Sequence, residues 1–208
     1  MKFLVRGTMA TTVAGCLLAG GATLASAGAT STSAAVTVTD AGYTPATATV
    51  QYGGKVTWSF KQGTHTVTDA TRLGLYNSGS KRAGSTYAFT FINSGTFPYH
   101  STVGTAISGK VVVPMTVTPA TGTRTTYFAV RWGSDYTPTG YSEQVQIKIP
   151  GASGWSSFVY GTPASNATFR AVDWGNKTGT YQLRAKLFKG STPGVSSGWS
   201  PIATATVH

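Results

Sequence analysis

The sequence predicts an all-β protein, and three observations lead to this. Val, Thr and aromatic residues, which fit a pleated surface, recur in short alternating runs. The chain contains 26 Gly and 9 Pro, many of them between those runs, and only 10% of its residues are charged. No segment outside the N-terminal apolar stretch shows a convincing helical period. Regular short strands separated by such turns indicate a β-sandwich or barrel.

The candidate strands fall into two regions. Those of the first region are expected at Val36–Val38, Ala48–Val50, Lys55–Trp58, Tyr87–Phe91 and Gly109–Val113. Those of the second are expected at Tyr127–Trp132, Val145–Ile149, Thr168–Val172, Tyr181–Phe188 and Ile202–Val207. Each region is long enough for a small sandwich. We therefore expect one domain over residues 35–113, a Thr-, Pro- and Ala-rich linker over 114–123, and a second domain over 124–208.

The first 27 residues have the pattern of an export signal. Lys2 and Arg6 precede an apolar stretch, and Ala25-Ser26-Ala27 forms a small-residue cleavage site. An alternative is a lipoprotein modified at Cys16, although the residues after Cys16 stay apolar. Residues 28–34 would be a small-residue tether. No later segment approaches the ~20 apolar residues of a spanning helix, so we expect a secreted protein, extracellular or associated with the cell envelope, without a membrane span.

The charge balance favours anionic partners. Sixteen basic residues against five acidic ones give +11, and removal of the signal would leave 14 against 5, or +9. Long-range attraction then favours an anionic cell-wall polymer or polysaccharide. Solubility alone is the competing explanation, because the basic residues are scattered except at Arg72, Lys81 and Arg82. Nothing resembles the basic and aromatic pattern of a nucleic-acid groove, so we expect no nucleic-acid partner.

Several short motifs of the first region occur in the order and spacing of one known family. They are Tyr43-Thr44-Pro45, Gly54-Lys55-Val56-Thr57-Trp58, His65 to Asp69, Asn77-Ser78-Gly79, Gly84 to Phe91, Gly95 to His100 and Ser108 to Val113. With them, residues 35–113 resemble a plastocyanin-like cupredoxin, a blue-copper domain. The resemblance implies a Greek-key β-sandwich and, where the copper ligands are present, electron transfer.

The resemblance also implies where the copper ligands would be. His65 stands at the first histidine position, while Ser101, Gly104 and Ile107 stand at the positions of the Cys, His and Met ligands. A type 1 site needs a thiolate and two imidazoles, which these residues cannot supply. We therefore expect a degenerate site and no cofactor, with His65 as a relict at the rim of a pocket closed by Ile107 and Phe60. The alternative function is a copper-binding electron carrier.

A weaker alternative is incidental binding of copper or zinc by His65 together with His100 or His208. Neighbouring side chains on a strand point to opposite faces. If Ser101 faces the former site, His100 faces away from it.

The second region contains motifs of another family. They are Val130-Arg131-Trp132, Tyr181 to Lys186 and Ser197-Gly198-Trp199-Ser200-Pro201. With them, residues 124–208 resemble a fibronectin type III domain, in which Tyr181 would be the corner tyrosine. The resemblance implies a second β-sandwich without chemistry of its own, with Trp132, Tyr181 and Trp199 in its core.

Trp155 and Trp174 are candidate surface-binding residues. Each lies among Gly, Ser or Asn residues, in Gly154-Trp155-Ser156-Ser157 and Asp173-Trp174-Gly175-Asn176. Aromatic side chains in such loops can stack on sugar rings or contact a partner, and packing beneath a loop is the alternative.

Catalysis is not expected. The five carboxylates are dispersed, and the three histidines form no evident catalytic arrangement. The spacing of His65 and Asp69, four residues apart, is weak evidence for a pair. The sequence thus favours a secreted, non-enzymatic binding or scaffold protein.

Overall fold

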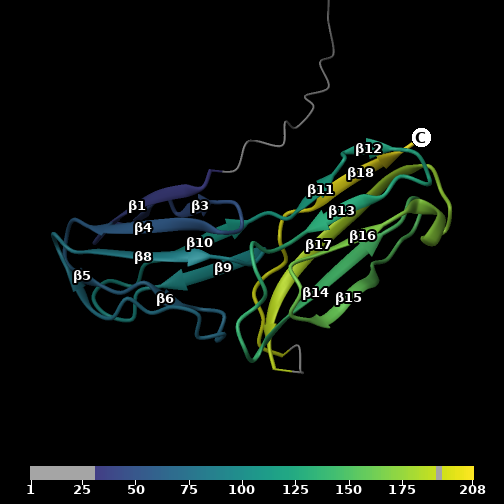
Figure 1. Cartoon of the computed structure of the whole chain (residues 1–208). Coiled ribbons are helices and arrows are strands. Elements are labelled where there is room, and N and C mark those ends of the chain that lie inside the picture. Colours follow the sequence, from purple (N-terminus) through teal and green to yellow (C-terminus); the bar gives the residue numbers. More distant parts are fainter. Residues whose placement is uncertain (1–30, 191–193) are drawn as a thin grey trace, which may run out of the picture.

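The computed structural model describes residues 31–190 and 194–208, so the expected export signal and Cys16 lie outside the described residues. The described chain is built of strands (Figure 1), which confirms the all-β prediction. Its one helical element is the short 3₁₀ turn η1 (Ala171–Asp173). No helix in the described ranges has the length and apolar character that crossing a membrane would require.

The first half of the chain forms two four-stranded sheets and a short ribbon. One sheet has the order β2 (Gly42–Thr44), β1 (Ser33–Thr39), β4 (Gly54–Phe60) and β8 (Thr86–Phe91). The other has the order β3 (Thr47–Thr49), β10 (Ser108–Val113), β9 (Gly95–His100) and β6 (Thr68–Asp69). The ribbon pairs β5 (Thr64–His65) with β7 (Lys81–Arg82).

Alternation along these strands produces the first core. In β4, Val56, Trp58 and Phe60 are buried while the residues between them are not, as the two-residue period of a strand requires. Trp58 packs edge to face against Tyr99, with ring centroids 5.4 Å apart. The pairs β1–β4 and β3–β10 are parallel, so their connections must cross between strands.

The second half also forms two sheets. The three-stranded sheet has the order β11 (Thr116–Thr118), β13 (Phe128–Arg131) and β16 (Asn166–Phe169). The five-stranded sheet has the order β12 (Thr121–Gly122), β18 (Ala203–Val207), β17 (Gly179–Lys189), β14 (Tyr141–Lys148) and β15 (Ser156–Thr162). Their facing sides enclose a separate core that includes Trp132, Phe128 and Tyr181.

Two segments expected to be unpaired are in fact paired. The expected linker, 114–123, contains β11 and β12, which pair with β13 and β18. Within the expected tether, β1 already begins at Ser33. A Thr-rich, uncharged composition suits an edge strand as well as a linker, and the pairing partners are distant in sequence. Strands β2, β5, β6, β7, β9 and β15 were likewise not predicted as strands.

The two sheet pairs are joined by more than the chain itself. Ser94 N–H donates to the Trp132 carbonyl, and Thr96 and Gly198 exchange two backbone hydrogen bonds of 2.9 and 2.8 Å. Leu187 of β17 is buried in the core of the first sheet pair. The Tyr141 hydroxyl donates to the Leu73 carbonyl at 2.8 Å. Backbone and side-chain contacts thus fuse the two sandwiches.

Candidate functional site

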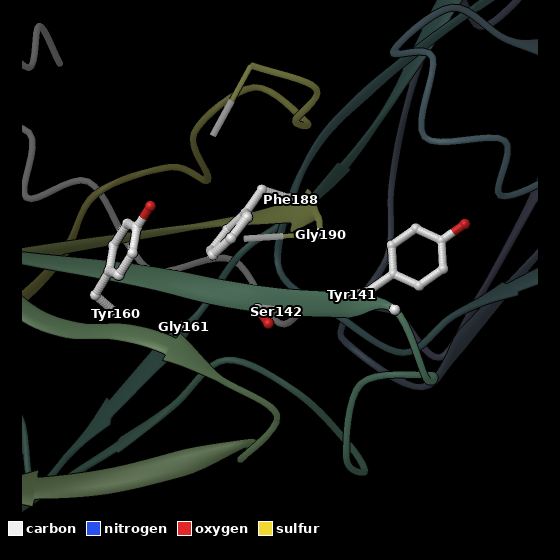
Figure 2. Close-up of a pocket in the computed structure, with 7 residues that line it drawn as sticks. Tyr141, Ser142, Tyr160, Gly161, Phe188 and Gly190 are labelled. Carbon is white, nitrogen blue, oxygen red and sulfur yellow. The ribbon is translucent and has the colours of Figure 1, made fainter. Parts of the chain in front are cut away.

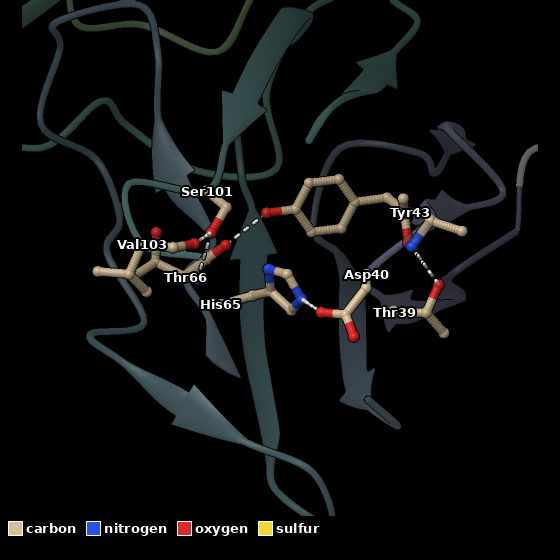
Figure 3. Close-up of polar contacts among 9 residues, drawn as sticks. Thr39, Asp40, Tyr43, His65, Thr66, Ser101 and Val103 are labelled. Atoms are coloured by element: carbon tan, nitrogen blue, oxygen red, sulfur yellow. Dashed lines mark hydrogen bonds and ion pairs between the residues drawn. The ribbon is translucent and has the colours of Figure 1, made fainter. Parts of the chain in front are cut away.

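His65 lies inside the first sandwich, at the end of β5. Its side chain is fully buried, and its Nε2 lies 2.9 Å from Oδ1 of Asp40, a half-exposed carboxylate in the turn after β1 (Figure 3). A neutral imidazole carries one N–H. If Nε2 carries this hydrogen and donates it to Asp40, Nδ1 has an unshared lone pair. No hydrogen-bond partner for Nδ1 lies among the described residues. The side chain was expected at the rim of a pocket, but it is fully buried and its ring is bonded to Asp40.

The sequence did not predict Asp40 as the partner of His65, and Asp69, which the sequence spacing suggested, is not that partner. Asp69 accepts hydrogen bonds from Thr71, Gly74 and Leu75 and so organises the loop that follows it. Asp40 lies 25 residues before His65, in a β-turn whose composition is ordinary. Gly63 permits the approach of the carboxylate, because a Cβ at Gly63, whose φ is +64°, would overlap Asp40.

Ser101 lies next to His65 but its hydroxyl is already used. Its Oγ accepts a hydrogen bond from Thr66 N–H at 3.0 Å and donates to the Val103 carbonyl at 2.6 Å (Figure 3). Tyr43 donates its hydroxyl proton to the carbonyl of Thr66. Ser101 therefore connects the end of β9 to the segment after β5.

Gly104 and Ile107 complete the loop that the sequence singled out. A Cβ built at Gly104 would lie 3.3 Å from His65 Nδ1 and would overlap the Thr64 carbonyl oxygen. Gly104 has φ +69°, a conformation that other residues seldom adopt. Ile107 is 7% exposed and belongs to the same core as Phe60. The structure thus places His65, Ser101 and Gly104 around one point, with Ile107 and Phe60 in the surrounding core.

The residues at this point do not fit a type 1 copper centre. The lone pair of His65 Nδ1 could bind a metal, but the neighbouring positions offer an engaged hydroxyl, a glycine and an isoleucine. No thiolate exists in the described chain, and a trigonal site depends on one. A side chain at Gly104 would also require a backbone shift, because its Cβ would overlap the Thr64 carbonyl oxygen.

Neither a family model nor a curated protein matches the chain. Over part of its length the chain is similar to cupredoxins. A purple cupredoxin from Nitrosopumilus maritimus is 19% identical over 38% of this chain and 98% of its own, with a TM-score of 0.36. A reduced amicyanin variant is 29% identical over 39% of this chain and 81% of its own, also with a TM-score of 0.36.

The other histidines do not join His65. His100 is the last residue of β9, and the next residue, Ser101, is buried. The side chain of His100 lines a shallow hollow together with Lys110, on the other face of the sheet from Ser101. His208 is the exposed last residue of the chain. Among residues 31–190 and 194–208, no three His, Cys, Asp or Glu side chains form a group able to hold a metal ion.

In the second sandwich, two of the three expected core aromatics are buried. Trp132 and Tyr181 are fully buried. The Tyr181 hydroxyl donates to the Lys177 carbonyl at 3.0 Å and accepts from the Lys177 N–H at 3.3 Å, closing the turn before β17. Trp199 is only half-buried, so its expected core position was wrong. It precedes β18 and lies over the outer face of the sheet rather than between the sheets.

Trp155 and Trp199 enclose one cation on that outer face. The Arg184 guanidinium carbon lies 4.2 Å from the ring centroid of Trp155 and 4.3 Å from that of Trp199. Lys186 Nζ lies 4.9 Å from the Trp199 ring. Gln146 Oε1 accepts hydrogen bonds from Arg184 Nε and Nη2 at 3.0 and 2.7 Å. We call the four side chains of Trp155, Arg184, Trp199 and Lys186 the cation–indole stack.

Trp174 has a different environment. It packs against Phe158, with ring centroids 5.7 Å apart, at the edge of the second core. Its carbonyl also accepts a hydrogen bond from the Tyr181 hydroxyl. Packing beneath the loop therefore accounts for Trp174, and the two candidate binding tryptophans do not lie together in one site.

Glu143 is a buried acidic residue that the sequence analysis missed. Its side chain is 0% exposed in β14, and neither carboxylate oxygen has a partner within hydrogen-bonding geometry. Burial raises the pKa of Glu143 well above 4.5, and the neighbouring Asn93 side chain offsets only part of this rise. The signal was present: with Val145 and Ile147 facing the core, strand alternation places Glu143 on the same face.

Proposed function

We propose that the chain is a secreted, non-enzymatic protein in which a cupredoxin-like sandwich without its type 1 copper site serves as a scaffold. The second sandwich acts as a binding module for an anionic polymer of the cell envelope. The observation that carries the first part is the Ser101 hydroxyl, which is held by Thr66 and Val103 where the resemblance expects a metal-binding sulfur.

The strand order of the second sandwich supports a fibronectin type III-like module. Its three-stranded sheet has the order β11-β13-β16, and its five-stranded sheet has the order β12-β18-β17-β14-β15. The closure of a turn by the Tyr181 hydroxyl is what a corner tyrosine would do. Such modules bind through their surface, which directs attention to exposed faces rather than to a catalytic pocket.

The charge distribution supports an anionic partner. The five acidic side chains are occupied or isolated: Asp173 pairs with Arg170, Asp40 with His65, and Asp69 with backbone N–H groups. Glu143 is buried, and Asp135 binds the Tyr136 N–H. Most cations of the described chain therefore face solvent without an acidic neighbour.

The chain from Gly28 onward, incubated with Cu(II) and desalted, is expected to stay colourless and to retain copper only weakly. The physical reason is the donor set, because intense colour and tight binding require a copper–thiolate bond. Visible absorption and metal analysis check this. An intense charge-transfer band with stoichiometric copper would favour the second candidate, an electron carrier, for which the free Nδ1 of His65 is the one supporting observation.

Binding to purified cell walls is expected at low salt and is expected to fall steeply as salt is raised. Charge attraction between exposed groups is screened within about 10 Å at 0.1 M and about 3 Å at 1 M ionic strength. A co-sedimentation assay over this range measures it, with walls stripped of their anionic polymers as the control. Retention that is unchanged at 1 M salt, or equal on stripped walls, would contradict the electrostatic mechanism.

A further inference from the structure

We propose that the outer face of the five-stranded sheet, at the cation–indole stack, is the site that binds a phosphate-bearing polyol or glycan chain. This inference rests on the proposed function and gives it a location. The site was not evident from the sequence, because Trp155, Trp199 and Arg184 come from three separate segments. Only the pairing of β14, β15, β17 and β18 brings them together.

Two cations of this face lack an anion. Arg184 and Lys186 are two residues apart on β17, so both project from the outer face, roughly 7 Å apart. Neither forms an ion pair within the described chain. Lys148 projects from the same face of β14, since its neighbour Ile147 is buried and Lys148 pairs with Gln182. Three positive groups thus line a surface on which the described chain places no carboxylate.

The guanidinium of Arg184 is held in a fixed plane and is not fully used. The two indole rings and Gln146 restrain it. An arginine has five N–H donors, and Gln146 accepts only two of them. Three remain for the oxygens of a ligand, and a planar guanidinium binds phosphate in a bidentate manner. Burial lowers the pKa of Arg184, and burial together with the charge of Arg184 lowers the pKa of Lys186. A bound anion would favour the charged form of both side chains.

An aromatic pocket continues the same face. Phe188 follows Lys186 by two residues and stacks on Tyr160, with ring centroids 5.3 Å apart (Figure 2). Phe188 is fully buried although it belongs to neither core, while Tyr160 is 49% exposed. Together with Ser142 and Gly190 they line a pocket of ≈ 310 Å³. The half-exposed Tyr160 ring, backed by Phe188 and close to the Ser142 hydroxyl, suits the C–H faces and hydroxyls of a sugar or polyol, features that a simple polyanion lacks.

The test measures binding of a soluble poly(glycerol phosphate) chain to the protein from Gly28 onward. The double variant Arg184→Gln/Lys186→Gln is expected to bind at least about tenfold more weakly, because two charge-assisted contacts are lost. The matched control, Lys55→Gln/Arg82→Gln, removes the same charge from exposed positions of the first sandwich and is expected to bind within about threefold of the parent. Melting temperatures of all variants establish that each is folded.

Two further variants separate geometry from charge. Arg184→Lys keeps the charge but loses the planar fork, and is expected to weaken binding several-fold. Tyr160→Ala opens the aromatic pocket and is expected to reduce binding without any change in charge.

The outcomes distinguish this inference from the proposed function. Equal weakening in the two double variants would overturn the site while leaving an electrostatic partner in place. No binding of poly(glycerol phosphate) by the parent, together with no retention on cell walls, would overturn both. Equal affinity for polyglutamate would overturn the assignment to a polyol or glycan, and binding of neutral dextran that Arg184→Gln/Lys186→Gln leaves unchanged would overturn the role of the cations.

Discussion

Replacing Trp132 by alanine is expected to lower the free energy of unfolding by about 3–5 kcal/mol. The indole is fully buried in the core of the second sandwich, and its Nε1–H donates to the Ala164 carbonyl at 2.7 Å. Truncation would leave a large cavity and a carbonyl without its donor. The backbone carbonyl of residue 132, which accepts the Ser94 N–H of the first sandwich, is kept in the alanine variant. Urea denaturation followed by far-UV circular dichroism measures it.

Two controls define the origin of this effect. Trp132→Phe retains most of the apolar volume but loses the hydrogen bond, and it is expected to cost clearly less than the alanine variant. Ile202→Ala truncates an apolar side chain that is 53% exposed and is expected to change stability by no more than about 0.5 kcal/mol. A cost below about 1 kcal/mol for Trp132→Ala would contradict the placement of this side chain in a packed core.

Glu143→Gln is expected to raise the free energy of unfolding by about 1–3 kcal/mol at pH 8 and to change it little at pH 4. Burial raises the folded-state pKa of Glu143 above its value of 4.5 in the unfolded chain. The folded state therefore holds the proton more tightly. The stability associated with the protonated carboxyl is fully present below about pH 4.5 and is lost as pH rises through the folded-state pKa. The neutral amide of Gln removes this loss.

Urea denaturation of the parent and of Glu143→Gln between pH 4 and pH 8 provides the measurement. The two curves should diverge as pH rises, by about 1.4 kcal/mol for each unit by which the pKa is raised. Asp135→Asn removes a carboxylate from an exposed residue and is the matched control. If the free energies of unfolding of Glu143→Gln and the parent changed with pH in the same way, this would contradict a raised pKa of the Glu143 carboxyl.

The periodicity of short strands was sufficient to predict the sheets but not all of their members. Longer strands such as β4 and β17, of seven and eleven residues, alternate over most of their length, and both were recognised. The missed strands β5, β6, β7 and β12 have two residues each. A pair of residues has no measurable period, and such strands exist only because a partner strand is present.

The loop of the expected copper site was located by resemblance, and its chemistry followed from residue types alone. A glycine and an isoleucine have no donor atoms in any conformation. The environment of His65 did not follow in this way. Asp40 reaches the ring across 25 residues of sequence, through a turn that Gly63 leaves open. Only the packing of β1 against β4 positions that turn.

What the sequence determined by itself is the class of fold, because alternation and turn residues act over a few neighbours, and the lack of a thiolate in the described chain, because composition does not depend on folding. What only the tertiary structure decided is which distant groups meet. Trp199 lies on the outer face because Ser200 N–H bonds the Ala185 carbonyl beside Arg184. Strand alternation already places Glu143 on the inner face of β14, but the position of Asn93 of the first sandwich beside its carboxylate was decided by the tertiary structure. Such contacts depend on the register between strands far apart in the chain, which local residue patterns do not encode.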